Sequence, residues 1–140
     1  MLNVNVICTG TLKEAYLRDA MKEYEKRLGA YCKFKVCELD EGKMLEALPP
    51  RAYNIALCIE GKQLSSEELA VKIERLPLEG YSELSFVIGA SDGLDERIKA
   101  KCNMRLSFSK MTFPHQLMRV ILAEQVYRAF TIINNGKYHK

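Results

Sequence analysis

Short apolar runs alternate with amphipathic segments along the chain, and this pattern predicts alternating strands and helices. The mostly apolar run at residues 4–8, which ends near Gly10, is typical of a strand buried in a sheet. Apolar residues then recur at helical spacing over residues 13–28, and Gly29 is placed to end that helix. The chain is therefore predicted to open with a strand and a helix.

The alternation continues through the rest of the chain. Further strands are predicted at residues 33–39, 55–59, 84–88 and 104–108. Further helical segments are predicted at residues 40–48, 65–77, 95–101 and 114–133. Ser65 with Glu68 three residues later forms a capping box at the start of one of these helices. Between the strand predicted at residues 55–59 and the helix predicted at residues 65–77, Glu60, Gly61 and Lys62 are predicted to turn the chain.

Strands that alternate with helices at this spacing predict an α/β fold with a mainly parallel sheet flanked by helices. No repeat, linker or low-complexity segment interrupts the pattern, so residues 1–140 are predicted to form a single domain. Ligand sites in parallel sheets form at the carboxyl ends of strands. Three loops qualify, those that follow Ile59, Ile88 and Phe108. A ligand that touches all three could be held largely by backbone groups.

The predicted helix at residues 114–133 is apolar on more than one side. Most of its apolar residues share one wide arc, but Leu117 and Ile121 lie on the opposite side with Arg128. Arg119 falls inside the apolar arc, where a charge is costly unless it is paired or sited at an opening. The simplest explanation is that one side packs on the sheet and another on a second copy of the chain. We therefore predict a two-fold homodimer.

The composition narrows the class of protein. Of 140 residues, 48% are hydrophobic and 28% are charged, which excludes a disordered chain. No apolar run approaches the roughly 18 residues of a membrane span, and the first ten residues do not resemble a signal peptide. The five cysteines form no paired motif and two histidines are too few for a metal site, so we expect no metal and a cytoplasmic location. A net charge of +3 is compatible with an RNA partner without arguing for one.

Several individual motifs are ambiguous on their own. The loop at residues 89–93 could cradle an anion, although a tight turn that needs glycine is the favoured explanation. His115 follows Pro114 at a helix start, where a histidine is more often a structural hydrogen-bonding group than a catalyst. Glu124 and Arg128 are four residues apart, as in an ordinary ion pair along a helix.

The last three residues, Tyr138, His139 and Lys140, combine an aromatic ring, an imidazole and a cation. Composition alone favours a frayed tail at this place. The same three side chains could also stack on a nucleic-acid base and contact a phosphate.

Longer stretches of the chain resemble a known family. They are VICTGTLKEAY, LCIEGK, VIGASDGL, SFSKMTFPHQLMRVILAEQVYRAF and a final YHK. Together they resemble the RlmH family of SPOUT-class methyltransferases, which act on the bacterial ribosome. The most specific part is the pattern PH-x-x-x-R-x-x-x-x-E-x-x-Y-R-A at residues 114–129, and the resemblance covers nearly the whole chain.

This resemblance implies an activity, a fold and a set of cofactor contacts. A methyl group would pass from S-adenosylmethionine to N3 of a pseudouridine in large-subunit (23S) ribosomal RNA, within the assembled ribosome. The sheet would carry a deep trefoil knot near its C-terminal end, an exception to the general absence of knots. The protein would be a homodimer with its cofactor pocket near the interface. The cofactor contacts would be Leu57, Gly89, Phe108, Ser109, Lys110, Met111, Thr112 and Phe113.

The chain departs from the family pattern at two places. Ala90 stands where the family usually has a second glycine, and alanine lacks the access of glycine to positive φ. The segment at residues 40–52 is shorter than is usual in the family. We expect a slightly different backbone at the first place and an altered contribution, such as to ribosome contact, at the second.

The candidate catalytic residues are His115, Glu124, Arg128, Tyr138 and His139. N3 of pseudouridine must lose a proton before it attacks, so a base or a polarising cation is expected nearby. We hypothesise that Tyr138 and His139, on a tail from the partner subunit, orient the target base, while Arg128 and Arg119 hold phosphate or base carbonyls. The identity of the base stays open, and water is one candidate. The alternatives are a SPOUT-type methyltransferase for another RNA and a non-catalytic flavodoxin-like or RNA-binding module.

Overall fold

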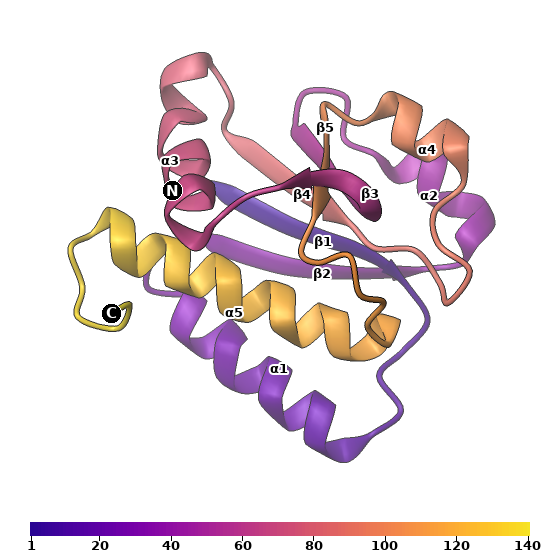
Figure 1. The fold of residues 1–140 in the computed structure, drawn as a ribbon, viewed down its shortest axis with the longest axis horizontal. Coiled ribbons are helices and arrows are strands. Elements are labelled where there is room, and N and C mark those ends of the chain that lie inside the picture. Colours follow the sequence, from indigo (N-terminus) through magenta and orange to yellow (C-terminus); the bar gives the residue numbers. More distant parts are fainter.

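The computed structural model describes residues 1–140 and confirms the α/β architecture (Figure 1). The sheet has five strands in the order β2-β1-β4-β3-β5, and every pair of neighbours is parallel. The strands are β1 (Asn3–Thr9), β2 (Lys33–Leu39), β3 (Tyr53–Gln63), β4 (Glu83–Val87) and β5 (Met104–Ser107). The central strands are the most buried, because helices cover both of their faces.

Helices form two unequal layers on the sheet (Figure 1). The larger layer consists of α1 (Ala15–Leu28), α3 (Ser66–Arg75) and α5 (His115–Ile133), with α5 packed between the other two. The smaller layer consists of the 3-10 turn η1 (Glu41–Lys43), α2 (Met44–Ala47) and α4 (Glu96–Lys101), while a further 3-10 turn, η2 (Pro77–Glu79), follows α3. The main core joins the larger layer to β1, β3 and β4, and a second small core lies under α2 and α4.

Local sequence signals explain several element boundaries. The capping box at α3 is confirmed, since the Ser65 hydroxyl accepts from the Glu68 amide and the Glu68 carboxylate accepts from the Ser65 amide. Gly29 ends α1 as predicted, although its φ of −57° is a right-handed conformation open to other residues. The single helical piece predicted at residues 40–48 is divided into η1 and α2.

The turn predicted at Glu60, Gly61 and Lys62 is wrong. Strand β3 continues to Gln63, and its pairing with β5 shifts register between Leu57 and Lys62. A Cβ on Gly61 would lie 2.7 Å from the backbone of Leu106, so glycine here permits a close approach of two strands. Gly61 marks an irregularity within the strand pair and not a turn, and both features favour glycine in a sequence.

Arg119 is paired, as its place in the apolar arc required. Its guanidinium is 1% exposed and donates to Glu38 Oε2 at 2.6 Å and to the carbonyls of Thr9 and Gly10 at 3.0 Å. The ion pair therefore ties α5 to the ends of β1 and β2. The expectation that Arg119 holds phosphate or a base carbonyl is wrong, because no solvent-facing donor is left.

We expect the substitution Glu38→Ala to destabilise the fold by about 3 kcal/mol, because it leaves the buried Arg119 charge without its carboxylate. Urea denaturation of the variant measures the loss. The matched control is Glu23→Ala, which removes an exposed i,i+4 pair with Arg27 and should cost less than about 1 kcal/mol. Equal losses of unfolding free energy in the two variants would show that the buried ion pair stabilises the fold no more than the exposed one.

Strand β5 lies at the sheet edge, and the chain then crosses back through residues 108–114 to begin α5 in the larger helical layer (Figure 1). The trefoil knot implied by the family resemblance stays a prediction. None of the helices is both long and apolar enough to cross a membrane.

Candidate active site

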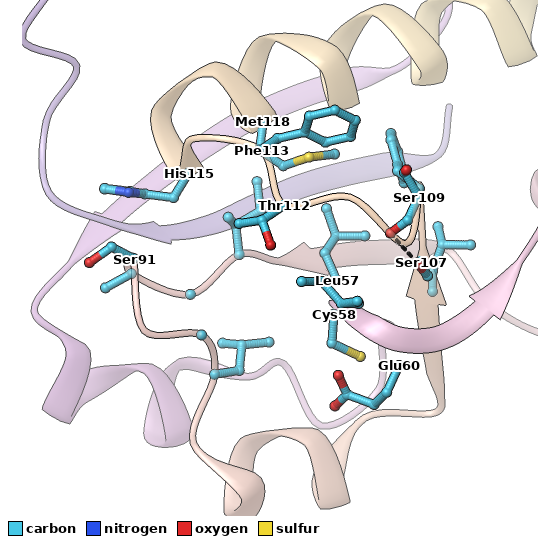
Figure 2. A pocket seen from close by; sticks show the side chains of 18 of the residues that line it. Leu57, Cys58, Glu60, Ser91, Ser107, Ser109, Thr112, Phe113, His115 and Met118 are labelled. Carbon is cyan, nitrogen blue, oxygen red and sulfur yellow. Dashed lines mark hydrogen bonds between the residues drawn. The ribbon is translucent and has the colours of Figure 1, made fainter.

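One pocket of about 360 Å³ lies between residues 57–60 of β3 and the loops that follow β4 and β5 (Figure 2). These are neighbouring strands in the sheet, so their carboxyl ends open on the same edge. The loops predicted after Ile88 and Phe108 both line this pocket, whereas the loop predicted after Ile59 is part of strand β3, whose residues 57–60 form the third wall. All the predicted cofactor residues line it except Lys110, namely Leu57, Gly89, Phe108, Ser109, Met111, Thr112 and Phe113.

The loop after β4 is held tight by glycine at two positions. A Cβ on Gly89 would lie 2.6 Å from the backbone of Gly93, and Gly93 itself has a φ of +89°. The Gly93 amide donates to the Ala90 carbonyl at 2.9 Å, which closes the turn. Among residues other than glycine only Asn135 has a positive φ, so Ala90 adopts a backbone conformation that any residue can take. The alanine at this position therefore fits without strain.

The loop after β5 is shaped by serine side chains. The Ser107 hydroxyl donates to the Ser109 carbonyl at 2.9 Å, and the Ser109 hydroxyl accepts from the Met111 amide at 3.0 Å. Figure 2 shows this loop curving over the pocket, with Phe113 beside Met118 at the start of α5. The apolar walls and the fixed backbone of this loop suit a flat, partly polar ligand.

Sequence reasoning missed part of the pocket wall. Cys58, Glu60 and Lys99 also line it, and Lys99 Nζ lies 2.6 Å from Glu60 Oε1. This hydrogen bond lowers the pKa of Glu60, while burial raises the pKa of the Cys58 thiol. The missed signal was position, because Cys58 and Glu60 lie just after Leu57, where the first stretch of regular pairing between β3 and β5 ends. The incorrect turn at Glu60 concealed it.

The candidate catalytic residues fall into two separate groups. His115 lines the pocket from the first turn of α5. Glu124, Arg128, Tyr138 and His139 instead gather near the other end of that helix. Met118 is the last residue of α5 that lines the pocket, and Arg128 lies ten residues further, which corresponds to about 15 Å along a helix. Within one chain, Arg128 and the tail that it holds therefore lie outside the pocket.

The tail at residues 136–140 folds back on α5, although its composition alone favours fraying. The Gly136 amide donates to the Thr131 carbonyl at 2.7 Å, and the Tyr138 ring packs edge-on against Tyr127. The Tyr138 hydroxyl donates to Glu124 Oε2 at 2.6 Å, and this bond raises the pKa of Tyr138 to about 12. The tail is thus ordered by contacts with its own helix.

A parallel sheet with a pocket built by three consecutive strand ends matches a described class of enzymes. Residues 2–139 match the family described as "Predicted SPOUT methyltransferase". Two solved structures share the fold, each with a TM-score of 0.63 and 14% identity. One is a probable methylase family protein from Haemophilus influenzae Rd KW20, matched over 99% of this chain and 71% of that one. The other is a probable methyltransferase from Bordetella pertussis Tohama I, matched over 92% and 96%.

Full-length relatives narrow the class. Proteins named Ribosomal RNA large subunit methyltransferase H are 48% identical in Bifidobacterium animalis subsp. lactis and 45% identical in Bacillus pumilus. Each match runs over 159 residues and covers 99% of this chain and 100% of the relative. The chain belongs to the RlmH family of SPOUT methyltransferases. Since it has 140 residues, the relatives carry residues that it lacks.

Proposed function

We propose that this protein transfers a methyl group from S-adenosylmethionine to N3 of a pseudouridine in 23S ribosomal RNA within the assembled ribosome, in the cytoplasm. The names of its full-length relatives support ribosomal RNA of the large subunit as the substrate. The observation that carries the proposal is the pocket, because seven of the eight residues expected from the family to touch the cofactor line it.

The residues of the pocket fit S-adenosylmethionine. Its volume of about 360 Å³ falls within the range of about 300–1,000 Å³ typical for small-molecule sites. Leu57, Phe108 and Phe113 supply apolar walls for the adenine, and the backbone of the loops at Gly89 and Ser109 supplies hydrogen bonds. The bound cofactor would contribute an electrophilic methyl group on a positively charged sulfur. The protein then has to align that methyl group with the attacking nitrogen.

We further propose a homodimer in which the tail of each subunit completes the pocket of its partner. Reacting groups must approach to about 3–3.5 Å, whereas Arg128, which holds the tail, lies about 15 Å along α5 from Met118 in the pocket of its own chain. A two-fold axis that pairs α5 with its copy in antiparallel sense brings the tail end of one helix to the pocket end of the other. The exposed Leu117 and Met111 near the pocket suit such an interface.

A two-part experiment tests the function. Thermal shift with S-adenosylmethionine should raise the melting temperature, since a ligand that binds only the folded state stabilises it. Ribosomes from a strain that lacks the enzyme should then gain one methylated pseudouridine when incubated with protein and cofactor, as located by mass mapping of 23S RNA. No thermal shift at millimolar cofactor would favour a non-catalytic module. A shift with methylation of a different RNA would favour a related enzyme with another target.

A further inference from the structure

The side chains that hold the tail form one connected hydrogen-bond network. Arg128 lies at its centre, with Nε 3.0 Å from Glu124 Oε1 and Nη1 3.1 Å from His139 Nδ1. Glu124 Oε2 in turn accepts the Tyr138 hydroxyl at 2.6 Å. The side chains of Arg128, His139 and Glu124 are at most 25% exposed, so water screens these contacts only in part. The network lies within one chain and would enter the partner's pocket as a unit.

The position of one proton follows from the chemistry of arginine. A guanidinium carries only donors, so the contact with His139 Nδ1 requires a lone pair on that nitrogen. An imidazole with a lone pair on Nδ1 carries its proton on Nε2. The surroundings of Nε2 agree, because the carboxylate oxygen Oε1 of Glu67 lies 3.5 Å away, where a donor is favoured.

The neighbours of His139 are unavailable as bases in the same arrangement. Glu124 already accepts from both Arg128 and Tyr138. The Tyr138 hydroxyl keeps its proton and donates a hydrogen bond to Glu124. Among Arg128, Glu124, Tyr138 and His139, therefore, no basic group keeps a free lone pair that faces outward, and the one exposed base beside them is the Glu67 carboxylate on α3.

We propose that Arg128 and Glu124 are positioning residues that hold His139 as the Nε2–H imidazole, so that the tail gives the target base a hydrogen-bond donor instead of a proton acceptor. This inference rests on the proposed methylation of N3. The exposed Glu67 carboxylate lies 3.5 Å from Nε2, so it gives way to a carbonyl oxygen of the base when RNA binds.

The chemistry balances without a protein base. The N3–H bond breaks and its proton passes to water, and the negative charge that remains on the imide spreads to the carbonyl oxygens beside N3. The Nε2–H group of His139 donates to one of these oxygens and stabilises the charge as it develops. The N3 lone pair then forms the N–CH₃ bond as the S–CH₃ bond breaks and sulfur keeps the electron pair.

Nitrogen NMR of the protein without RNA tests the proton position directly. The chain has two histidines, so His115→Gln identifies the His139 signals by subtraction. At neutral pH we expect His139 to be predominantly the Nε2–H form, and Arg128→Ala to remove that preference. A Nδ1–H form or a doubly protonated ring in the unmodified protein would overturn the inference.

Two isosteric substitutions test the role in catalysis. The amide nitrogen of Gln in His139→Gln can occupy the place of Nε2 and donate, whereas that of Asn in His139→Asn corresponds to Nδ1. We expect His139→Asn to lose about 10²–10³-fold in kcat and His139→Gln to retain at least about tenfold more activity than Asn. Equal inactivity of the two folded variants would overturn the donor role of His139. An inactive unmodified protein would instead contradict the methylation proposal itself, whatever the NMR result.

Discussion

Removal of Tyr138, His139 and Lys140 should abolish methyl transfer and leave S-adenosylmethionine binding almost unchanged. None of the three lines the pocket, and Arg128, which holds them, lies about 15 Å along α5 from Met118, the nearest pocket residue of that helix. The removal should therefore lower kcat, because the RNA base is no longer oriented, and should leave the dissociation constant of the cofactor unchanged. We expect turnover to fall at least about 10³-fold, because orientation and the donor are lost together. Calorimetry for the cofactor and a methyl-transfer assay on ribosomes measure the two effects.

The control for the shortened protein is Lys137→Ala, which changes an exposed charge next to the removed segment and should leave turnover within about twofold. Unchanged turnover after the removal would exclude the tail from the mechanism. A parallel loss of cofactor affinity would indicate that the tail supports the pocket of its own chain.

The substitution Gly89→Ala should weaken S-adenosylmethionine binding by more than about tenfold, which is a change of about 1.4 kcal/mol. An added Cβ would lie 2.6 Å from both the carbonyl carbon and the oxygen of Gly93 and 2.8 Å from the Leu94 amide nitrogen. These are backbone atoms of a closed turn, so the turn has to open and the pocket floor moves with it. Isothermal calorimetry measures the affinity.

Gly42→Ala is the matched control for Gly89→Ala, because a Cβ at Gly42 would meet no atom within 4 Å and that residue lies outside the pocket. We expect its cofactor affinity to equal that of the unmodified protein. Equal affinity of Gly89→Ala would show that the turn adapts freely and that its tight closure has no part in binding.

The fold was predictable from the sequence because each segment of this chain shows either a strand-like or a helix-like pattern of apolar residues, and not both. The buried run of β1 and the capping box at Ser65 each place an element within a residue or two. Gly61 was the exception. A glycine in a bulge and a glycine in a turn look alike in one dimension, and only the backbone of Leu106 across the strand pair distinguishes them.

The segments that form the site were predictable from the sequence, whereas the contacts between their side chains were less so. The convergence of β3 with the loops after β4 and β5 follows from the parallel direction of the strands, whereas the individual cofactor residues were implied by the family resemblance. Lys99 could not, because its contact with Glu60 joins residues far apart in sequence through tertiary packing alone. Arg119 and Arg128 stand on one helix with similar chemistry, yet one is locked to Glu38 and the other to the tail. The helix period placed Arg119 in the apolar arc, but the identity of its partner required the folded structure.

The most direct test of the proposed shared active site mixes two defective variants and assays them at a cofactor concentration well below the dissociation constant of the pocket variant. The first variant carries Gly89→Ala, and a separate variant with Thr112→Arg, which blocks the pocket, can take its place. The second variant lacks residues 138–140. If each pocket uses the partner's tail, a random mixture of subunits should regain roughly a quarter of the unmodified methyl-transfer activity, because half of the dimers hold one intact site. If each pocket used its own tail, no chain in the mixture would hold an intact site. A mixture that forms dimers and stays inactive would contradict the account.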